Sequence, residues 1–102
     1  MVVTDVFIDH LRGFRPLEAR AGIHYSVITR CELFAGQHVD EATVNELLGG
    51  FAELLLTREI AETAGRLRRT SRILTPDALI AATALEYSLE LHTRNVRDFQ
   101  PR

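Results

Sequence analysis

Four short segments along the chain have the hydrophobic pattern of β-strands. Residues 1–4 are apolar and rich in β-branched side chains, and residues 23–27 alternate and include an aromatic ring. Residues 89–93 form a third such segment near the C-terminus. Residues 53–56 form a fourth, which could also extend the helix before it, and we predict a short strand there.

Helical patterns fill the intervals between these strands. The predicted helices cover residues 6–13, 28–35, 41–48, 57–69 and 75–88, and another is expected to begin near Pro16. Gly13 is expected to close the first helix, Asp40 or Glu41 to open the third, and Thr57 to cap the fourth. Strands that alternate with helices predict an α/β fold with a parallel sheet, and 102 residues are enough for a single domain.

The clearest of these helices begins around Thr75. Thr75 is a suitable N-cap, and Pro76 suits the first helical position, where a missing N–H costs no hydrogen bond. Asp77 then lies in the first turn, where the helix dipole favours a negative charge. The residues that follow are apolar on nearly every side of the helix, which predicts that the helix is buried.

Acidic and polar residues follow the predicted strands, or begin the predicted helices, at four separate places: Asp5, residues 29–32, Asp77 and residues 95–98. Ligands of parallel α/β sheets bind beyond the carboxyl ends of the strands, so we expect these segments to meet at one end of the sheet. Carboxylates gathered at one point repel one another unless a cation is present, and hard cations such as Mg²⁺ or Mn²⁺ prefer their oxygen atoms. Such an ion can activate water for attack on a phosphodiester.

Each acidic residue also has a purely structural explanation. Glu32 is three residues after Thr29, which is the spacing of a capping box. Asp77 could serve only the helix dipole, and Asp5 could cap the first helix. Simple solvated charges are the alternative for the other two, Asp9 and Asp98. The acidic residues taken together are therefore stronger evidence for a metal site than any one of them alone.

Composition narrows the class of protein. The chain has 46% hydrophobic and 25% charged residues and a net charge of −2, so it is an ordinary globular protein without a strong overall attraction to nucleic acid. No apolar run reaches the length of a membrane span and no signal-peptide pattern is present, so we expect a cytoplasmic protein. All basic side chains are arginine. Arg12, Arg94 and Arg97 lie near the expected site and could contact phosphates or serve only as surface charges.

The cysteine and histidine content argues against other metal sites. Cys31 is the single cysteine, which excludes an internal disulfide and a cysteine cluster, and its neighbours predict a buried, inert thiol. The four histidines share no short metal-ligand spacing, so a zinc site is not expected.

Four motifs together resemble the PIN-domain toxins of the VapC family. Residues 6–13 (VFIDHLRG) are similar to the family's opening, residues 26–36 (SVITRCELFAG) to its second motif, residues 76–84 (PDALIAATA) to its third and residues 93–99 (TRNVRDF) to its fourth. The motifs occur in the family's order and span nearly the whole chain.

The resemblance implies a PIN-like three-layer α/β/α fold with a short, mostly parallel central sheet. It also implies a metal-dependent endoribonuclease toxin that uses Mg²⁺ or Mn²⁺, pairs with a VapB-like antitoxin and forms a homodimer. The family's acidic site falls on Glu32, on Asp77 and on Asn95 or Asp98, of which we rank Asp98 first. The expected metal ligands are Asp5, Glu32, Asp77 and Asp98, with support from Thr4, Asp9, Thr93 and Asn95.

The first motif departs from the family pattern at Val3, where the family usually has an aspartate. If the first strand continues to Asp5, that side chain would point to the same side as Val3 and could partly replace the missing ligand. The alternative is a weakened or absent metal site, and thus a catalytically impaired PIN-fold protein that acts through binding an antitoxin or RNA. A phospho-acceptor domain with a flavodoxin-like sheet is a third reading, but it would need a lysine and the chain has none.

Overall fold

The computed structural model describes residues 1–13 and 22–93 of the chain. In these residues five helices and two strands follow one another in the order α1 (Thr4–Leu11), β1 (His24–Ser26), α2 (Val27–Phe34), α3 (Glu41–Leu48), β2 (Ala52–Leu54), α4 (Arg58–Thr70) and α5 (Thr75–Glu86). The helix predicted near Pro16 and the segment after Thr93 lie outside the described residues. No helix in the described part is both long and apolar enough to cross a membrane.

A thin sheet of parallel strands runs through the middle of the molecule. β1 and β2 pair in parallel, with His24 opposite Ala52 and Ser26 opposite Leu54. The N-terminal segment lies beside β1, since the Val2 amide donates to the His24 carbonyl (2.9 Å). On the side away from β1, Val2 of this segment forms an isolated parallel bridge with His92. The four predicted strands are therefore neighbours, in the order β2, β1, N-terminal segment, C-terminal segment.

All four predicted strands are shorter than expected, and β1 and β2 cover three residues each. Residues 1–4 and 89–93 contribute only the Val2–His92 bridge, because α1 begins at Thr4 and ends the extended segment after Val3. Val3 is the N-cap residue of α1, with an extended backbone (φ −95°, ψ 167°). The prediction that the first strand includes Thr4 and could reach Asp5 is therefore wrong.

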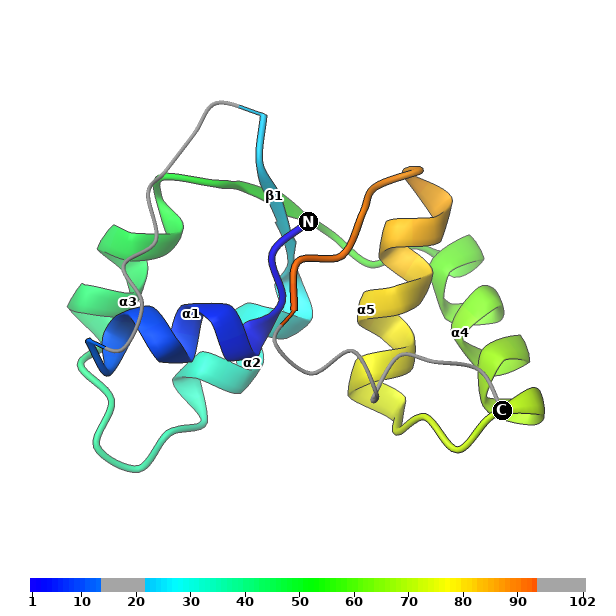
Figure 1. The fold of residues 1–102 in the computed structure, drawn as a ribbon, viewed down its shortest axis with the longest axis horizontal. Coiled ribbons are helices and arrows are strands. Elements are labelled where there is room, and N and C mark those ends of the chain that lie inside the picture. Colours follow the sequence, from blue (N-terminus) through cyan, green and yellow to red (C-terminus); the bar gives the residue numbers. More distant parts are fainter. Residues whose placement is uncertain (14–21, 94–102) are drawn as a thin grey trace.

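Helices cover the sheet on both sides, as a three-layer α/β/α fold requires. Figure 1 shows α1, α2 and α3 gathered on one side of the strands and α4 and α5 on the other. Phe7 and Tyr25 are fully buried on the first side, where their rings meet edge to face with centroids 5.8 Å apart. On the second side Ile60 and Ala64 of α4 pack against Ala78 of α5. The α/β class and the three layers are confirmed.

The α5 helix is buried on most of its surface, as predicted. Ala78 and Ala82 face α4, whereas Ile80 and Ala84 pack against Met1 and Val3 of the N-terminal segment. The helix thus contributes to two of the three hydrophobic clusters in the described residues. Its first turn is consequently held at one end of the sheet.

Helix starts follow the predicted capping residues in two cases. The Asp40 carboxylate accepts from the amides of Ala42 (3.1 Å) and Thr43 (3.4 Å) at the start of α3. The Thr57 hydroxyl accepts from the Ile60 amide (3.2 Å) at the start of α4. Both side chains satisfy amides that have no partner within the helix.

The start of α5 differs from the prediction by one residue. Leu74, not Thr75, is the N-cap residue, because the Leu74 carbonyl accepts the first helical hydrogen bond from the Ala78 amide (2.8 Å). Thr75 and Pro76 are then the first two helical residues. The second position suits proline as well as the first, since neither amide has a partner within the helix.

The predicted burial of Cys31 is also wrong, because its thiol is exposed. Thr29 and Leu33, four residues apart, form the buried face of α2. Cys31 is two residues from each of them, about 200° around the helix from either, and therefore faces solvent.

Candidate active site

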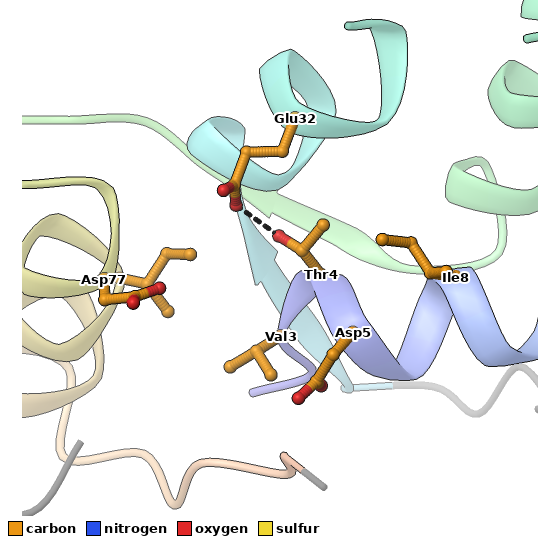
Figure 2. Close-up of a pocket in the computed structure, with 7 residues that line it drawn as sticks. Val3, Thr4, Asp5, Ile8, Glu32 and Asp77 are labelled. Atoms are coloured by element: carbon orange, nitrogen blue, oxygen red, sulfur yellow. Dashed lines mark hydrogen bonds between the residues drawn. The ribbon is translucent and has the colours of Figure 1, made fainter. Parts of the chain in front are cut away.

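An open cavity of about 190 Å³ lies where α1, α2 and α5 begin or meet. Its lining combines three carboxylates and a hydroxyl with apolar side chains, namely Val3, Thr4, Asp5, Ile8, Glu32, Asp77 and Ile80. Figure 2 shows these side chains coming from three helices and the N-terminal segment. The structure therefore brings together three of the segments that the sequence predicted to meet.

Glu32 is held in this cavity by Thr4. The Thr4 hydroxyl donates to Glu32 Oε1 (2.5 Å) and pairs with the Thr29 hydroxyl (3.1 Å), and Thr29 is completely buried. This contact links α1 to α2 (Figure 2). It uses Oε1, so Oε2 is the oxygen that a ligand in the cavity can approach.

The capping-box explanation for Glu32 is wrong. The N-cap of α2 is Ser26, whose hydroxyl accepts from the Ile28 amide (3.1 Å). Thr29 is the third residue of the helix rather than its cap, so its hydroxyl is directed toward Thr4. The sequence carries the signal for this, since a serine directly before the helical pattern is a preferred N-cap.

Asp5 is the second residue of α1, and its carboxylate is partly satisfied. Thr93 donates to Asp5 Oδ2 (2.8 Å), because the bridge between Val2 and His92 brings Thr93 beside the start of α1. Asp5 Oδ1 is buried and has no hydrogen-bond partner among the residues that the structure describes. Figure 2 shows the carboxylate pointing away from Glu32, so Asp5 neither caps α1 nor replaces an acid at Val3 in the way expected from a strand.

Asp77 lies in the first turn of α5 and is half-buried. Figure 2 shows its carboxylate directed from α5 into the cavity, toward the side that carries Thr4 and Glu32. Glu32 and Asp77, which are 45 residues apart in the sequence, thus face the same space from two different helices.

Val3 forms an apolar wall of the cavity. Its side chain is 3% exposed and packs against Ile80 and Ala84 of α5 and against Met1. The position at which the resemblance leads one to expect an aspartate is therefore part of the hydrophobic core.

The carboxylates share a cavity without converging on a point. In the described part of the chain no group of three or more His, Cys, Asp or Glu side chains is placed to hold a metal ion. Oxygen donors nevertheless suit a hard cation, and Mg²⁺ is commonly held by one or two carboxylates while it keeps several waters. Glu32 and Asp77, whose carboxylates face the same cavity, fit a cation of that kind.

Two of the other predicted residues are placed differently from expectation. Asp9 is buried in α1, at 5% exposure, and is not a solvated charge. Arg12 is exposed at the C-terminal end of α1, about 12 Å along the helix from Thr4. The structure therefore does not bring Arg12 to the cavity. The remaining predicted site residues, Arg94, Asn95, Arg97 and Asp98, lie outside the described residues.

The sequence of the chain matches the PIN domain family over residues 1–100. It is 35% identical to Ribonuclease VapC19 of Mycobacterium tuberculosis, in the strains CDC 1551 / Oshkosh and ATCC 25618 / H37Rv, and the alignment covers 97% of this chain and 90% of that protein.

Two solved structures have the same fold. The first is described as a toxin-antitoxin complex from Klebsiella pneumoniae, with 34% identity and a TM-score of 0.81 over 96% of this chain and 88% of that one. The second is VapBC-1 from nontypeable Haemophilus influenzae, which at 24% identity supports the fold alone, with a TM-score of 0.78 over 98% of this chain and 89% of that one. The resemblance carried by the four sequence motifs is thus confirmed, and the chain belongs to the PIN domain family.

Proposed function

We propose that this protein is the ribonuclease toxin of a toxin–antitoxin pair and that it hydrolyses RNA phosphodiester bonds internally, with Mg²⁺ or Mn²⁺. The observation that carries the proposal is the pair of carboxylates, Glu32 and Asp77, that face one open cavity from α2 and α5. The 35% identity to a protein named as a ribonuclease supports the reaction class.

Glu32 and Asp77 would hold the cation, and Asp98 would complete the set, as the family resemblance implies. When bound, a divalent cation supplies charge stabilisation at the phosphoryl oxygens and lowers the pKa of an attacking water. Thr4 fixes the direction of the Glu32 carboxylate through its hydrogen bond to Oε1. Thr93 does the same for Asp5 through Oδ2.

The apolar part of the cavity orients the substrate by exclusion. Val3 and Ile80 form one wall, and Ile8 extends it along α1. Such walls limit where charged phosphate groups can lie, because a phosphate placed against them would lose hydration without gaining a partner. Phosphate groups are therefore expected nearer to the carboxylates and to Thr4 than against these apolar side chains.

The proposed protein partner is a small antitoxin, and the proposed assembly is a homodimer. The likeness to a toxin–antitoxin complex at 34% identity supports an antitoxin. The resemblance to VapC toxins implies the dimer.

The test is RNA cleavage by the purified protein in Mn²⁺ or Mg²⁺, followed by chelation with EDTA. We expect cleavage with the metal and none after chelation, and we expect Asp77→Asn to reduce the rate by about 100-fold or more. Circular dichroism of the variant provides the control for folding. Full metal-dependent activity in Asp77→Asn would contradict the proposal.

A second candidate is a catalytically impaired PIN-domain protein that acts by binding alone. The buried Val3 favours it, because an apolar side chain occupies a wall of the carboxylate cavity. The variant Val3→Asp separates the two candidates through Mn²⁺ affinity, measured by calorimetry. A tenfold or larger gain in affinity, together with new cleavage activity, would support impairment, and an unchanged affinity in an active protein would support the ribonuclease.

A further inference from the structure

We propose that four arginines at the end of α4 and in the turn before α5 bind the phosphate backbone of the RNA strand next to the catalytic cavity. These residues, the arginine patch, are Arg66, Arg68, Arg69 and Arg72. The inference rests on the proposed ribonuclease function, and it adds the surface along which the substrate is held.

The patch is a local concentration of positive charge on a chain whose net charge is −2. Residues 66–72 contain four arginines and no acidic residue, and all four side chains are exposed. Among the residues that the structure describes, the ion pair of Arg30 with Glu53 includes none of the four patch arginines. The exposed guanidinium groups of the patch, apart from the Nε of Arg68, are available to an anionic partner.

The geometry of α4 directs the patch away from the core. Leu67 packs into the cluster between α4 and α5. Arg66 and Arg68 are one residue to either side of it and therefore about 100° away around the helix, while Arg69 is about 200° away. The arginines thus spread over the solvent side of the helix end.

The turn between the helices holds the patch beside the first turn of α5, on the side of α5 away from α1 and α2 (Figure 1). Arg68 Nε donates to the Ile73 carbonyl (3.2 Å), and the Ser71 hydroxyl donates to the Leu67 carbonyl (2.9 Å). Figure 1 shows the end of α4 and the first turn of α5 at the same end of this helix pair. Arg72 is five residues before Asp77, so their Cα atoms are at most about 18 Å apart.

The helix dipole explains only part of this arrangement. Arg68 and Arg69 lie in the last turn of α4, where a positive charge is favourable. Arg72 lies beyond the end of the helix and Arg66 lies before its last turn, so the dipole accounts for neither. An RNA backbone accounts for all four, because guanidinium groups bind phosphates through paired N–H donors and the cavity must receive a polyanion.

The experiment measures RNA binding in the Asp77→Asn protein, which prevents cleavage during the measurement. The probe is a fluorescein-labelled single-stranded RNA of about 20 nucleotides, longer than a typical single-strand binding site. The test variant adds Arg66→Gln, Arg69→Gln and Arg72→Gln and retains Arg68, which supports the turn. The matched control adds Arg58→Gln, an exposed arginine at the other end of the same helix.

We expect the triple substitution to weaken RNA binding roughly 10- to 100-fold at about 0.1 M salt. The slope of log K against log salt concentration should fall by about 2, since each lost single-strand phosphate contact removes about 0.7. The Arg58→Gln control should retain the affinity and slope of the Asp77→Asn protein.

Unchanged affinity and salt slope in the triple variant would overturn the proposal. Weaker binding of a poly-glutamate peptide with unchanged RNA binding would also overturn it, because the patch would then serve an acidic protein. Metal-dependent RNA cleavage is measured in a separate experiment, with the chain that carries no substitution. An absence of metal-dependent cleavage together with the expected loss of binding would refute the ribonuclease function and leave the patch as an RNA-binding surface.

Discussion

Charged side chains on the two faces of helix α2 have very different surroundings. On one side Arg30 is surrounded by partners: it donates to Glu53 (2.6 Å), to Asn45 (2.7 Å) and to the Tyr25 hydroxyl (3.0 Å). The guanidinium also lies 5.9 Å from the centroid of the Phe34 ring. Tyr25 in turn donates to Glu53 (3.0 Å). This network joins α2 to β1, β2 and α3.

On the other side, about 200° around the helix, Glu32 faces the cavity, where the Thr4 hydroxyl is its partner among the described residues. The neighbouring Asp5 has one buried oxygen with no partner in residues 1–13 and 22–93. Buried polar atoms are normally satisfied, so an exception indicates strain or a missing ligand. The comparison thus sets the paired charges around Arg30 on one face of α2 against the Glu32 carboxylate, which lines an open cavity, on the other.

The largest expected effect is loss of activity in Glu32→Gln without loss of stability. The substitution keeps the shape of the side chain and a hydrogen-bond acceptor for Thr4, but it removes the charge that would hold a cation. We expect cleavage to fall by about 100- to 1,000-fold. The midpoint temperature of thermal unfolding should change by no more than a few degrees. A large destabilisation would mean that Glu32 has a structural role.

The Arg30 network should give the opposite result. Arg30→Ala leaves Glu53, Asn45 and the Tyr25 hydroxyl without their shared donor, and we expect a loss of about 1–2 kcal/mol in the free energy of unfolding. The estimate is modest because the Arg30 and Glu53 side chains are 34% and 30% exposed.

Cleavage by the folded fraction of Arg30→Ala should be nearly unchanged. Arg30→Lys is the matched control, since it keeps the charge but cannot reproduce three donors in a planar fork. The free energy of unfolding of Arg30→Lys, measured in urea, should lie between those of the original chain and Arg30→Ala. A loss of cleavage in both variants with normal stability would contradict the division between the two faces.

The smallest expected effect is a pH dependence of stability that comes from Glu53. The hydrogen bond from Arg30 holds the pKa of Glu53 below its ordinary value of 4.5, and the Tyr25 hydrogen bond acts in the same direction. The stabilisation is therefore complete above the unfolded pKa and is lost as the pH falls through the lower folded pKa.

Urea unfolding at about pH 6 and about pH 3 measures this effect in the original chain and in Glu53→Gln. The original chain should lose more stability than the variant on acidification, by less than about 1 kcal/mol. The pKa of Asp40 is also lowered, by hydrogen bonds from Thr43, so both proteins lose this part of their stability equally on acidification. The difference between the two proteins isolates Glu53, and equal losses would show that the pair is not formed in solution.

Local sequence determined much of this fold. The caps at Asp40 and Thr57, the buried α5 helix and the position of β1 follow from short-range patterns, because a capping side chain and an amphipathic period act within a few residues. The motifs around Glu32 and Asp77 were also readable, and both residues line the same cavity.

Tertiary structure alone decided the contacts at the start of α1. Val2 hydrogen-bonds to His24, and His92 forms a bridge on the other side, so the extended segment ends at Val3 and α1 begins at Thr4. This start places Thr4 against Glu32 and turns Asp5 toward Thr93. No local pattern encodes these pairings, because each depends on segments 22 to 90 residues away that become neighbours only when the sheet forms.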